Sequence, residues 1–362
     1  MSNELIRARE IISQVDREMA KLFVKRMEAA RIIAEYKASH GLEILDEARE
    51  AKVIADGSAM VESDELRSYY VNFLKKTMAV SRSYQSKLME GMRIAYCGTE
   101  GAFAHIAACQ LFPDGRKIGF SSFEEAYRAV ADGICEVAVL PIENSYQGEV
   151  GQVTDLMFSG SLYISEVTEI AISHDLLGVP GASLADIKQV VSHPQALGQC
   201  REYIRSHGLC EVEYDNTALA ASYVKEKGDK SLAAIASAEA AEIFGLQVIE
   251  KNINASRTNT TRFAVFSRSE NRHTEGEVGI NTILLFTVRN EAGALAEAID
   301  IIGKHGFNMR SLRSRPMKEL LWQYYFYVEA EGNLDTAEGR AMLAELSGCC
   351  DKLKAVGNYT KV

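Results

Sequence analysis

The sequence predicts three segments of different fold class: an all-helical segment, an α/β segment, and a smaller α+β segment with the ferredoxin-like order βαββαβ. Three observations support this division. Proline is absent before Pro113 and glycine is rare before Gly91, which favours long helices. Short Val- and Ile-rich runs then alternate with helical stretches. The polar stretch 268–278 is typical of a linker before the last segment. The predicted domains are residues 1–91, 92–270 and 279–362.

Composition excludes several classes of protein. The chain has 362 residues and a formal net charge of −10, so its overall field repels nucleic acid. No stretch approaches the length of an apolar membrane span, and the first residues contain no signal-peptide core. None of the seven cysteines forms a Cys-x-x-Cys pair, which favours buried, reduced thiols. We therefore expect a cytoplasmic protein that binds neither DNA nor membrane.

The first helix carries two cations on its apolar face. At about 100° per residue, Arg26 and Lys37 fall within the stripe of apolar side chains expected to face the core. An unpaired buried cation costs several kcal/mol, so these two need two anions or one dianion. Pairing with Asp46 or Glu50, or extension of the side chains to solvent, is the alternative. The apolar stripe consists of Ile12, Val15, Met19, Leu22, Phe23, Ala30 and Ile33.

Further polar residues can join these cations in a pocket. Asp46, Arg49 and Glu50 are spaced so that one helical turn presents them together. Ser81 and Gln85 stand four residues apart on an otherwise apolar side of the third helix. Residues 1–90 contain no cysteine, which makes covalent or metal chemistry unexpected there. The pattern predicts a wet pocket that works by positioning and charge complementarity.

This segment resembles the all-helical chorismate mutases over about 85 residues. The residues that carry the resemblance are Arg9, Asp16, Arg26, Lys37, Asp46, Arg49, Glu50, Ser81 and Gln85. The resemblance implies a dimer that shares its long first helix, with Arg9 contributed by the partner chain. A pericyclic rearrangement needs no nucleophile, only a compact conformer and stabilisation of charge in the transition state.

The resemblance also implies a role for each residue in the pocket. Arg26 and Ser81 hold substrate carboxylates. Lys37 and Gln85 stabilise negative charge that develops on the ether oxygen. Carboxylate and hydroxyl groups of the substrate are contacted by Arg49 and by Asp46 or Glu50.

The α/β segment has four marked loops. Gly98 and Gly101 stand where a strand turns into a helix, and such a loop exposes backbone N–H groups; an ordinary turn is the alternative. Polar residues follow the apolar strands 137–140 and 187–191, at the edge where α/β sheets bind ligands. A hydroxyl-rich stretch leads into a further strand. These last three loops are 141–145, 192–195 followed by Gln199, and 256–263.

These loops resemble the motifs of the prephenate dehydratases. The motifs are Pro-Ile-Glu-Asn-Ser at 141–145, Ser-His-Pro-Gln at 192–195 and Thr-Arg-Phe at 261–263, in order across the segment. The resemblance implies two α/β lobes, similar to periplasmic binding proteins, with the substrate between them. It makes Thr261 the proton donor or the orienting residue for the departing hydroxyl, and Arg262 a partner for a carboxylate. The other implied substrate-binding residues are Glu143, Asn144, Ser145, Ser192 and Gln199.

The first loop departs from that family. The usual Gly-Pro pair is Gly98-Thr99 here, and Ala102 and Ala104 stand where Ser or Thr is common. Only backbone N–H groups remain as local donors in this loop.

The last segment resembles the ACT regulatory domain of prephenate dehydratases. Its expected strands and helices alternate in the order βαββαβ. The expected strands are 280–288, 308–313, 321–330 and 353–359, and the expected helices are 292–305 and 336–347. The resemblance implies phenylalanine as effector, although Arg313 replaces the family's glutamate. A dimerisation domain without ligand is the alternative. The implied effector-binding residues are Gly293, Ala294, Leu295, Ser314, Arg315 and Pro316.

Together the resemblances imply an enzyme with two active sites. It converts chorismate to prephenate and then to phenylpyruvate, is inhibited by phenylalanine, and assembles as a homodimer or tetramer. We expect neither a cofactor nor a metal. Two rival readings stay open: an amino-acid sensor without catalysis, which Ala102 and Ala104 favour and Thr261 opposes, and a mutase with a purely regulatory remainder.

Overall fold

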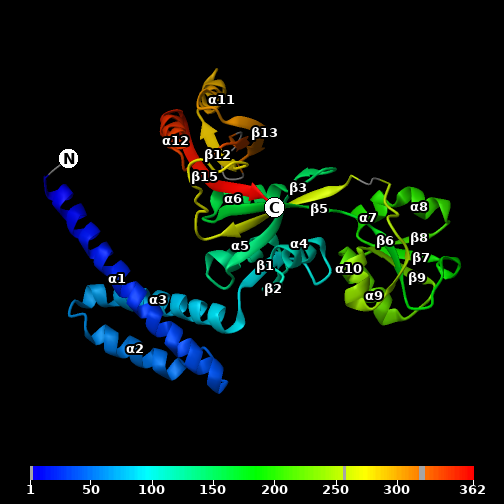
Figure 1. Ribbon diagram of the computed structural model, residues 1–362, viewed down its shortest axis with the longest axis horizontal. Coiled ribbons are helices and arrows are strands. Elements are labelled where there is room, and N and C mark those ends of the chain that lie inside the picture. The colour runs from blue at the N-terminus through cyan, green and yellow to red at the C-terminus, as the bar shows by residue number, and fades with distance from the viewer. Residues whose placement is uncertain (1–2, 256–257, 318–322) are drawn as a thin grey trace. The chain divides into compact units, whose positions relative to one another are not determined.

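The computed structural model describes residues 3–255, 258–317 and 323–362. The chain divides into two compact units, Met1–Arg93 and Ile94–Val362 (Figure 1). The expected strand 321–330 begins outside the described residues, at 321–322. Among the residues that the structure describes, no helix is both long and apolar enough to cross a membrane.

The first unit consists of three helices whose ends follow from local sequence. Their bounds are α1 Asn3–His40, α2 Glu47–Ala59 and α3 Asp64–Glu90. α1 extends for 38 residues because no glycine or proline interrupts it before Gly41, which has a φ of 64°. Asp46 and Ser63 cap α2 and α3 by accepting hydrogen bonds from backbone N–H groups.

The apolar stripe of α1 is not a core in this chain. Ile12 is 60% exposed and Leu22 is 65% exposed, and every residue from Glu4 to Arg26 is exposed. Further along the helix, Ala30 and Ala34 are buried. The prediction of a buried stripe with buried cations was therefore wrong for the isolated chain, because helical periodicity marks an apolar face without saying what covers it.

The second unit begins with an α/β lobe. Its central strands lie in the order β5-β11-β3-β1-β2, with β11 antiparallel to both neighbours. The chain returns to this lobe through β11 after building the second lobe. The elements are β1 Arg93–Cys97, α4 Phe103–Leu111, β2 Arg116–Phe120, α5 Phe123–Ala131, β3 Val137–Asn144, β4 Gly148–Glu149, α6 Gly151–Ser159, β5 Tyr163–Ala171 and β11 Thr260–Ser267.

The second lobe is a five-stranded sheet with its own core. The strand order is β10-β6-β9-β7-β8, and alanine-rich helices pack on it. Two segments connect the lobes, one between β5 and β6 and one between β10 and β11. The predicted two-lobed α/β architecture is present. The elements are β6 Asp175–Gly178, a 3₁₀ turn Leu184–Asp186, β7 Gln189–Ser192, α7 Pro194–Gln199, α8 Arg201–Ser206, β8 Cys210–Glu213, α9 Thr217–Lys227, β9 Leu232–Ala236, α10 Ala238–Phe244 and β10 Gln247–Glu250.

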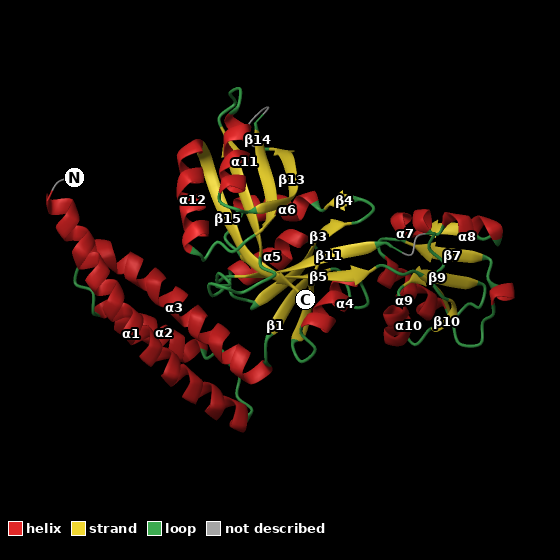
Figure 2. Ribbon diagram, turned by 45° about the horizontal axis from the view of Figure 1, so that its top comes forward, coloured by secondary structure: helices red, strands yellow, loops and turns green. Residues whose placement is uncertain are grey.

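The C-terminal part has the predicted order βαββαβ. Its strands lie in the order β13-β14-β12-β15, and α11 and α12 lie next to each other against this sheet (Figure 2). Leu284, Phe286 and Val328 from the sheet pack with residues of both helices. The elements are β12 Asn281–Val288, α11 Ala294–Lys304, β13 Asn308–Pro316, β14 Tyr324–Glu331, α12 Ala337–Cys349 and β15 Cys350–Lys361.

The last strand joins this part to the first lobe. β15 runs on beyond its partner β12 and pairs with β5 through Thr360 and Lys361, so the two sheets are continuous. The expected linker 268–278 is also held in place. Arg268 donates to the carbonyl oxygens of Val130 and Cys135, at 2.6 and 2.7 Å. The polar composition of this stretch therefore reflects hydrogen bonding to the lobe rather than an untethered connection.

The cysteines fit the sequence prediction only in part. All seven are free thiols, and Cys135 and Cys200 are buried. Cys210 is exposed, and the remaining four are half-buried. Cys210 begins β8, which lies at the edge of its sheet, so the fold gives it no cover.

Candidate active sites

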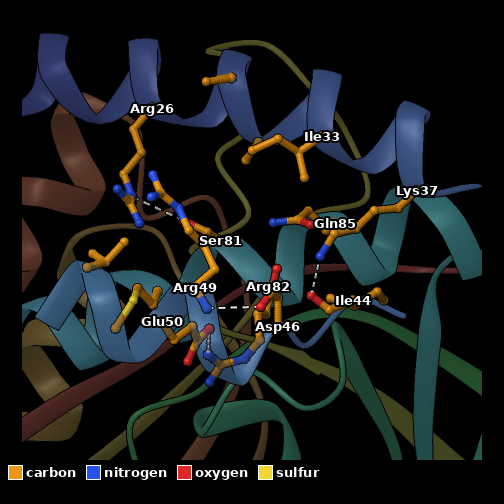
Figure 3. A pocket seen from close by; sticks show the side chains of 14 residues that line it. Arg26, Ile33, Lys37, Ile44, Asp46, Arg49, Glu50, Ser81, Arg82 and Gln85 are labelled. Atoms are coloured by element: carbon orange, nitrogen blue, oxygen red, sulfur yellow. Dashed lines mark hydrogen bonds and ion pairs between the residues drawn. The ribbon is translucent and has the colours of Figure 1, made fainter. Parts of the chain in front are cut away.

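The three helices of the first unit surround a cavity of about 270 Å³ (Figure 3). Side chains from all three helices point into it, and Ile33, Val53 and Met78 supply apolar walls. Seven residues that the sequence predicted for this pocket line it. They are Arg26, Lys37, Asp46, Arg49, Glu50, Ser81 and Gln85.

Two cations of the cavity, Arg26 and Lys37, are held by neutral groups. Arg26 Nε donates to Ser81 Oγ at 3.2 Å, and Lys37 Nζ donates to the carbonyl oxygen of Ile44 at 2.6 Å. Among the described residues, neither cation has a carboxylate partner. Gln85 is buried, and its Oε1 has no hydrogen-bond partner in the described part of the chain. Their charge and hydrogen-bonding capacity therefore remain available to a ligand.

The acidic residues are used within the protein. Asp46 Oδ1 accepts from the backbone N–H of Arg49 at 2.9 Å, which makes it the cap of α2. Glu50 forms an ion pair with Arg82 of α3. The alternative that Asp46 or Glu50 neutralises Arg26 or Lys37 is thus not what the structure contains. With four basic and two acidic side chains, the lining has a formal charge of +2, which suits a dianion.

One lining residue escaped the sequence analysis, and one predicted residue lies elsewhere. Arg82 is three residues before Gln85, a spacing that places both on one face of α3 and could have identified it. Arg9 does not line the cavity. It stands seventeen residues before Arg26, or about 25 Å along the helix. Within a single chain, Arg9 therefore cannot reach a ligand held by Arg26.

A second polar site lies where the two lobes meet. Gln199 and Asn259 line a cavity of about 340 Å³ together with Tyr146, Gln147 and Gln195. The predicted residues Asn144 and Thr261 are not among the lining residues, but they are hydrogen-bonded to each other and, through Asn144, to Asn259, which lines the cavity. Asn144 Nδ2 donates to Asn259 Oδ1 and to Thr261 Oγ1, both at 2.9 Å.

The two lobes share this hydrogen-bonded group. Asn144 and Thr261 come from the neighbouring strands β3 and β11, where they are cross-strand partners. Gln199 ends α7 of the second lobe, and Asn259 Nδ2 donates to its Oε1 at 3.2 Å. Asn144 and Thr261 are each only 8% exposed. The structure thus joins three of the predicted dehydratase residues in one network across the lobes.

Two predicted serines serve the scaffold. Ser192 is fully buried, and its hydroxyl donates to the carbonyl oxygen of Ile235 at 2.5 Å. Ser145 Oγ accepts from the backbone N–H of Thr260 at 3.0 Å and ties two loops together. Ser192 ends a strand and Ser145 follows one, and a hydroxyl at such a position can bond either to a ligand or to the backbone. The motifs alone therefore did not distinguish a ligand-binding serine from a structural one. Residues 256–257 of the hydroxyl-rich stretch lie outside the described residues.

Arg262 and Glu143 face away from the cavity. Successive side chains of a strand point to opposite faces, so Arg262 points away from the side that holds Thr261. Its guanidinium binds Glu143 at 3.0 Å and Glu329 of β14 at 2.7 Å. Burial alone would lower the pKa of Arg262. The hydrogen bonds to Glu329 and the negative charge of Glu329 outweigh burial and raise the pKa of Arg262 above its ordinary value. The predicted contact between Arg262 and a substrate carboxylate is therefore replaced by an ion pair with the C-terminal part.

One of the predicted effector residues, Arg315, binds carboxylates of the first lobe. Arg315 forms ion pairs with Glu149 and Asp155, and its Nε donates to the Tyr325 hydroxyl at 3.0 Å. Arg313 pairs with Glu143. Gly293 is the N-cap residue of α11, with a φ of 89° and open space beside it. Within one chain, Arg315 is thus held by protein carboxylates. Arg313 has Glu143 as its ion-pair partner. A glutamate at position 313, as in the family that the segment resembles, would repel Glu143.

The glycine-containing loop leads into α4, which begins beside His174. Ala102 precedes α4 and provides no side-chain cap, as expected from the loss of a hydroxyl residue. Phe103, the first residue of α4, meets the His174 ring edge-on at 5.8 Å. His174 and Asn259 belong to the same hydrogen-bonded group and were not named as site residues. His174 lies in no motif, whereas Asn259 lies in the predicted stretch 256–263 without being singled out.

The matches to protein families cover both units. The family model for chorismate mutase type II matches residues 8–86, and that for prephenate dehydratase matches residues 94–271. A "Bifunctional chorismate mutase/prephenate dehydratase" of Escherichia coli strain K12 is 29% identical and covers 99% of this chain and 96% of its own. A protein of the same description from Aquifex aeolicus is also 29% identical and covers 99% of this chain and 98% of its own.

Solved structures match the second unit. A prephenate dehydratase from Arthrobacter aurescens in complex with L-Phe has a TM-score of 0.68 and 28% identity, covering 74% of this chain and 90% of its own. A protein described as GqqA, a novel type of quorum quenching acylase, has a TM-score of 0.69 and 34% identity, covering 75% of this chain and 98% of its own.

Proposed function

Because this chain belongs to the family of bifunctional chorismate mutase/prephenate dehydratases, we propose that its two polar cavities are the two active sites of that family. The chain rearranges chorismate to prephenate, and it dehydrates and decarboxylates prephenate to phenylpyruvate. The observation that carries the proposal is that each unit has its own polar cavity at the predicted residues. Seven of them line the helical cavity. In the second unit Gln199 lines the cavity and is joined through Asn259 to Asn144 and Thr261.

The helical cavity suits the rearrangement. Chorismate is a dianion, and the lining has a formal charge of +2. Arg26 and Arg49 bind its carboxylates, with Ser81 holding the Arg26 side chain. Lys37 and Gln85 face the ether oxygen and stabilise the negative charge that develops as the carbon–oxygen bond breaks. No group of the site needs to form a covalent bond with the substrate.

The cavity between the lobes suits the dehydration. Thr261 Oγ1 accepts a hydrogen bond from Asn144, so its own proton is directed elsewhere and can be donated to the leaving hydroxyl. Gln199 and Asn259 supply amide groups along the cavity wall. Loss of carbon dioxide and water forms an aromatic ring, so the hydroxyl needs only a well-placed donor and not a strong acid.

Ultraviolet absorbance tests the two activities with the complete chain. Chorismate alone, without added metal or nucleotide, is expected to give prephenate and then phenylpyruvate. Accumulation of prephenate as the end product would favour a mutase with a regulatory remainder. A chain that binds prephenate but leaves it unchanged for hours would favour a non-catalytic sensor, and either result would overturn the bifunctional assignment.

The exposed apolar face of α1 supports a dimer. Ile12, Leu22 and Phe23 are left uncovered in the single chain, and burying each recovers about 1.5–3 kcal/mol. The same contact brings the partner's Arg9 toward the cavity, as the resemblance implies. Leu22→Glu is expected to yield monomers in analytical ultracentrifugation and to lower mutase activity. Lys21→Glu, one residue away, is the matched control and should keep both. A monomeric wild-type chain with full mutase activity would contradict this prediction.

The C-terminal part is proposed to be an ACT domain that senses phenylalanine. Its strand order and the L-Phe complex of the similar Arthrobacter enzyme support this assignment. Calorimetric titration of L-phenylalanine into the complete chain is expected to release heat and to inhibit prephenate turnover. No heat at millimolar phenylalanine would leave only a dimerisation role. A homodimer or tetramer in the cytoplasm, without cofactor, stays a prediction.

A further inference from the structure

His174 is a buried residue at the junction of the two lobes that no motif brought to notice. It lies between β5 and β6, and only 3% of its surface is exposed. Its Nε2 is 2.8 Å from Oε1 of Gln199, and Phe103 packs against the ring. The opposite ring nitrogen, Nδ1, has no hydrogen-bond partner among the described residues.

The direction of each hydrogen bond in this network can be fixed from Asn144. Its Oδ1 accepts from the backbone N–H groups of Tyr146 and Gln147, at 2.9 and 3.1 Å. A backbone N–H can only donate, so the oxygen of this amide is identified and Nδ2 must face Asn259 and Thr261. Asn144 therefore donates to both of them.

The amide orientation of Asn259 in turn fixes which ring nitrogen of His174 carries a hydrogen. Because Asn259 Oδ1 accepts from Asn144, Asn259 Nδ2 is the group that faces Gln199, and it donates to Gln199 Oε1. An oxygen cannot donate, so the ring Nε2 of His174 must carry a hydrogen and donate to the same Oε1. Gln199 Oε1 is thus held by two donors, and its –NH₂ group is turned away from both.

We propose that His174 is a positioning residue for prephenate dehydration: it donates to Gln199 Oε1 and thereby holds the Gln199 –NH₂ group toward the substrate cavity. The proposal rests on the proposed function of this cavity. Gln199 lines the cavity, and no described residue accepts from its –NH₂ hydrogens, so they serve an acceptor on the substrate, a carboxylate or carbonyl oxygen. Without the His174 donor, the amide of Gln199 loses one of the two contacts that fix its orientation.

The neutral ring suits this task. Burial lowers the pKa of His174, which favours the uncharged form. In that form Nδ1 carries no hydrogen, so no N–H group is left unsatisfied beside the Phe103 ring. The ring therefore has one donor to offer, and the structure directs it to Gln199.

Two substitutions separate the donor from the ring. His174→Gln keeps an N–H donor the same number of bonds from the backbone as Nε2, whereas His174→Phe keeps a ring of similar shape and removes the donor. We expect kcat/KM for prephenate to fall about three- to tenfold in His174→Phe, the effect of losing one of the two hydrogen bonds to Gln199 Oε1, and to recover to within about twofold in His174→Gln. His174→Asn, whose amide is one bond shorter, is expected to fail like His174→Phe and replaces it should the phenylalanine variant not fold.

A double-mutant cycle makes the test specific. In a Gln199→Ala background, His174→Phe is expected to cause little further loss, because the group that it positions is already gone. Mutase activity of the same chains should be unchanged and monitors folding. Equal losses in the glutamine and phenylalanine variants, or additive losses in the cycle, would overturn the positioning role. Failure of the wild-type chain to turn over prephenate would instead overturn the proposed function itself.

Discussion

Thr261→Ala is expected to lower prephenate dehydratase activity by about a hundred- to ten-thousandfold, the range for a lost proton donor. The hydroxyl accepts from Asn144 and so keeps its proton for the substrate, and alanine supplies neither function. Chorismate consumption is expected to continue, with prephenate accumulating. The measurement is the separate rate of each step on the same preparation.

Two further substitutions at the same position refine this prediction. Thr261→Ser retains the hydroxyl and should keep much of the activity, whereas Thr261→Val preserves the shape and should behave like alanine. A Thr261→Ala chain that dehydrates prephenate within tenfold of the wild-type rate would show that another group donates the proton. Loss of both activities in a folded variant would contradict the assignment of two separate sites.

Arg26→Ala is expected to have the complementary effect, a loss of mutase activity of at least about a hundredfold with dehydratase activity unchanged. Arg26 is held toward the cavity by Ser81 and has no carboxylate partner in the described residues, so its charge is available to the substrate. Removing a donor that acts on a charged group in such a site costs about 3–4 kcal/mol. Rates of chorismate disappearance and prephenate consumption check both halves.

Arg17→Ala is the matched control for Arg26→Ala. Arg17 lies on the same helix, is exposed, and donates only to the backbone carbonyl of Ser13 at 3.0 Å. Its loss should leave both rates within about twofold, since surface changes of this kind rarely exceed 0.5 kcal/mol. Equal losses in the two variants would mean that general damage to α1, and not the charge of Arg26, explains the result.

The sequence predicted which side chains line the pocket of the first unit. It did not predict how much of the apolar face of α1 is buried. Arg26, Lys37, Ser81 and Gln85 could be grouped because helical periodicity fixes which side chains share a face. The exposure of Leu22 could not be foreseen, since an apolar stripe looks the same whether its cover comes from this chain or from another. The roles of these residues stay predictions until the variants are measured.

For the second site, motifs located the strands but not the direction of each side chain. Thr261 and Arg262 are adjacent in one motif, yet strand alternation places them on opposite faces. Asn259 lies in the predicted stretch 256–263 but was not singled out, and His174 entered no prediction. Their partners lie 115 and 25 residues away in the sequence. Hydrogen bonds between loops that are distant in the sequence depend on the tertiary fold, and the spacing of residues within one short motif does not predict them.

The C-terminal part illustrates the same limit. Its order βαββαβ followed from the alternation of apolar runs, but β15 extends beyond the predicted end at residue 359. Those extra residues pair with β5, and Arg315 turns to the first lobe instead of staying available for an effector. Neither feature is visible in the segment taken alone.

The shared sheet has a consequence for how this enzyme can be divided. β15 covers the edge of β5, and Glu329 neutralises the buried Arg262 of the dehydratase strand. Cutting the chain before residue 279 would uncover the part of the β5 edge that pairs with Thr360 and Lys361, and an unpaired strand edge is a template for intermolecular pairing. It would also remove Glu329 from Arg262, which would keep Glu143 as its partner. The shortened chain is thus predisposed to aggregate, so an inactive truncation would reveal more about colloidal behaviour than about allosteric control.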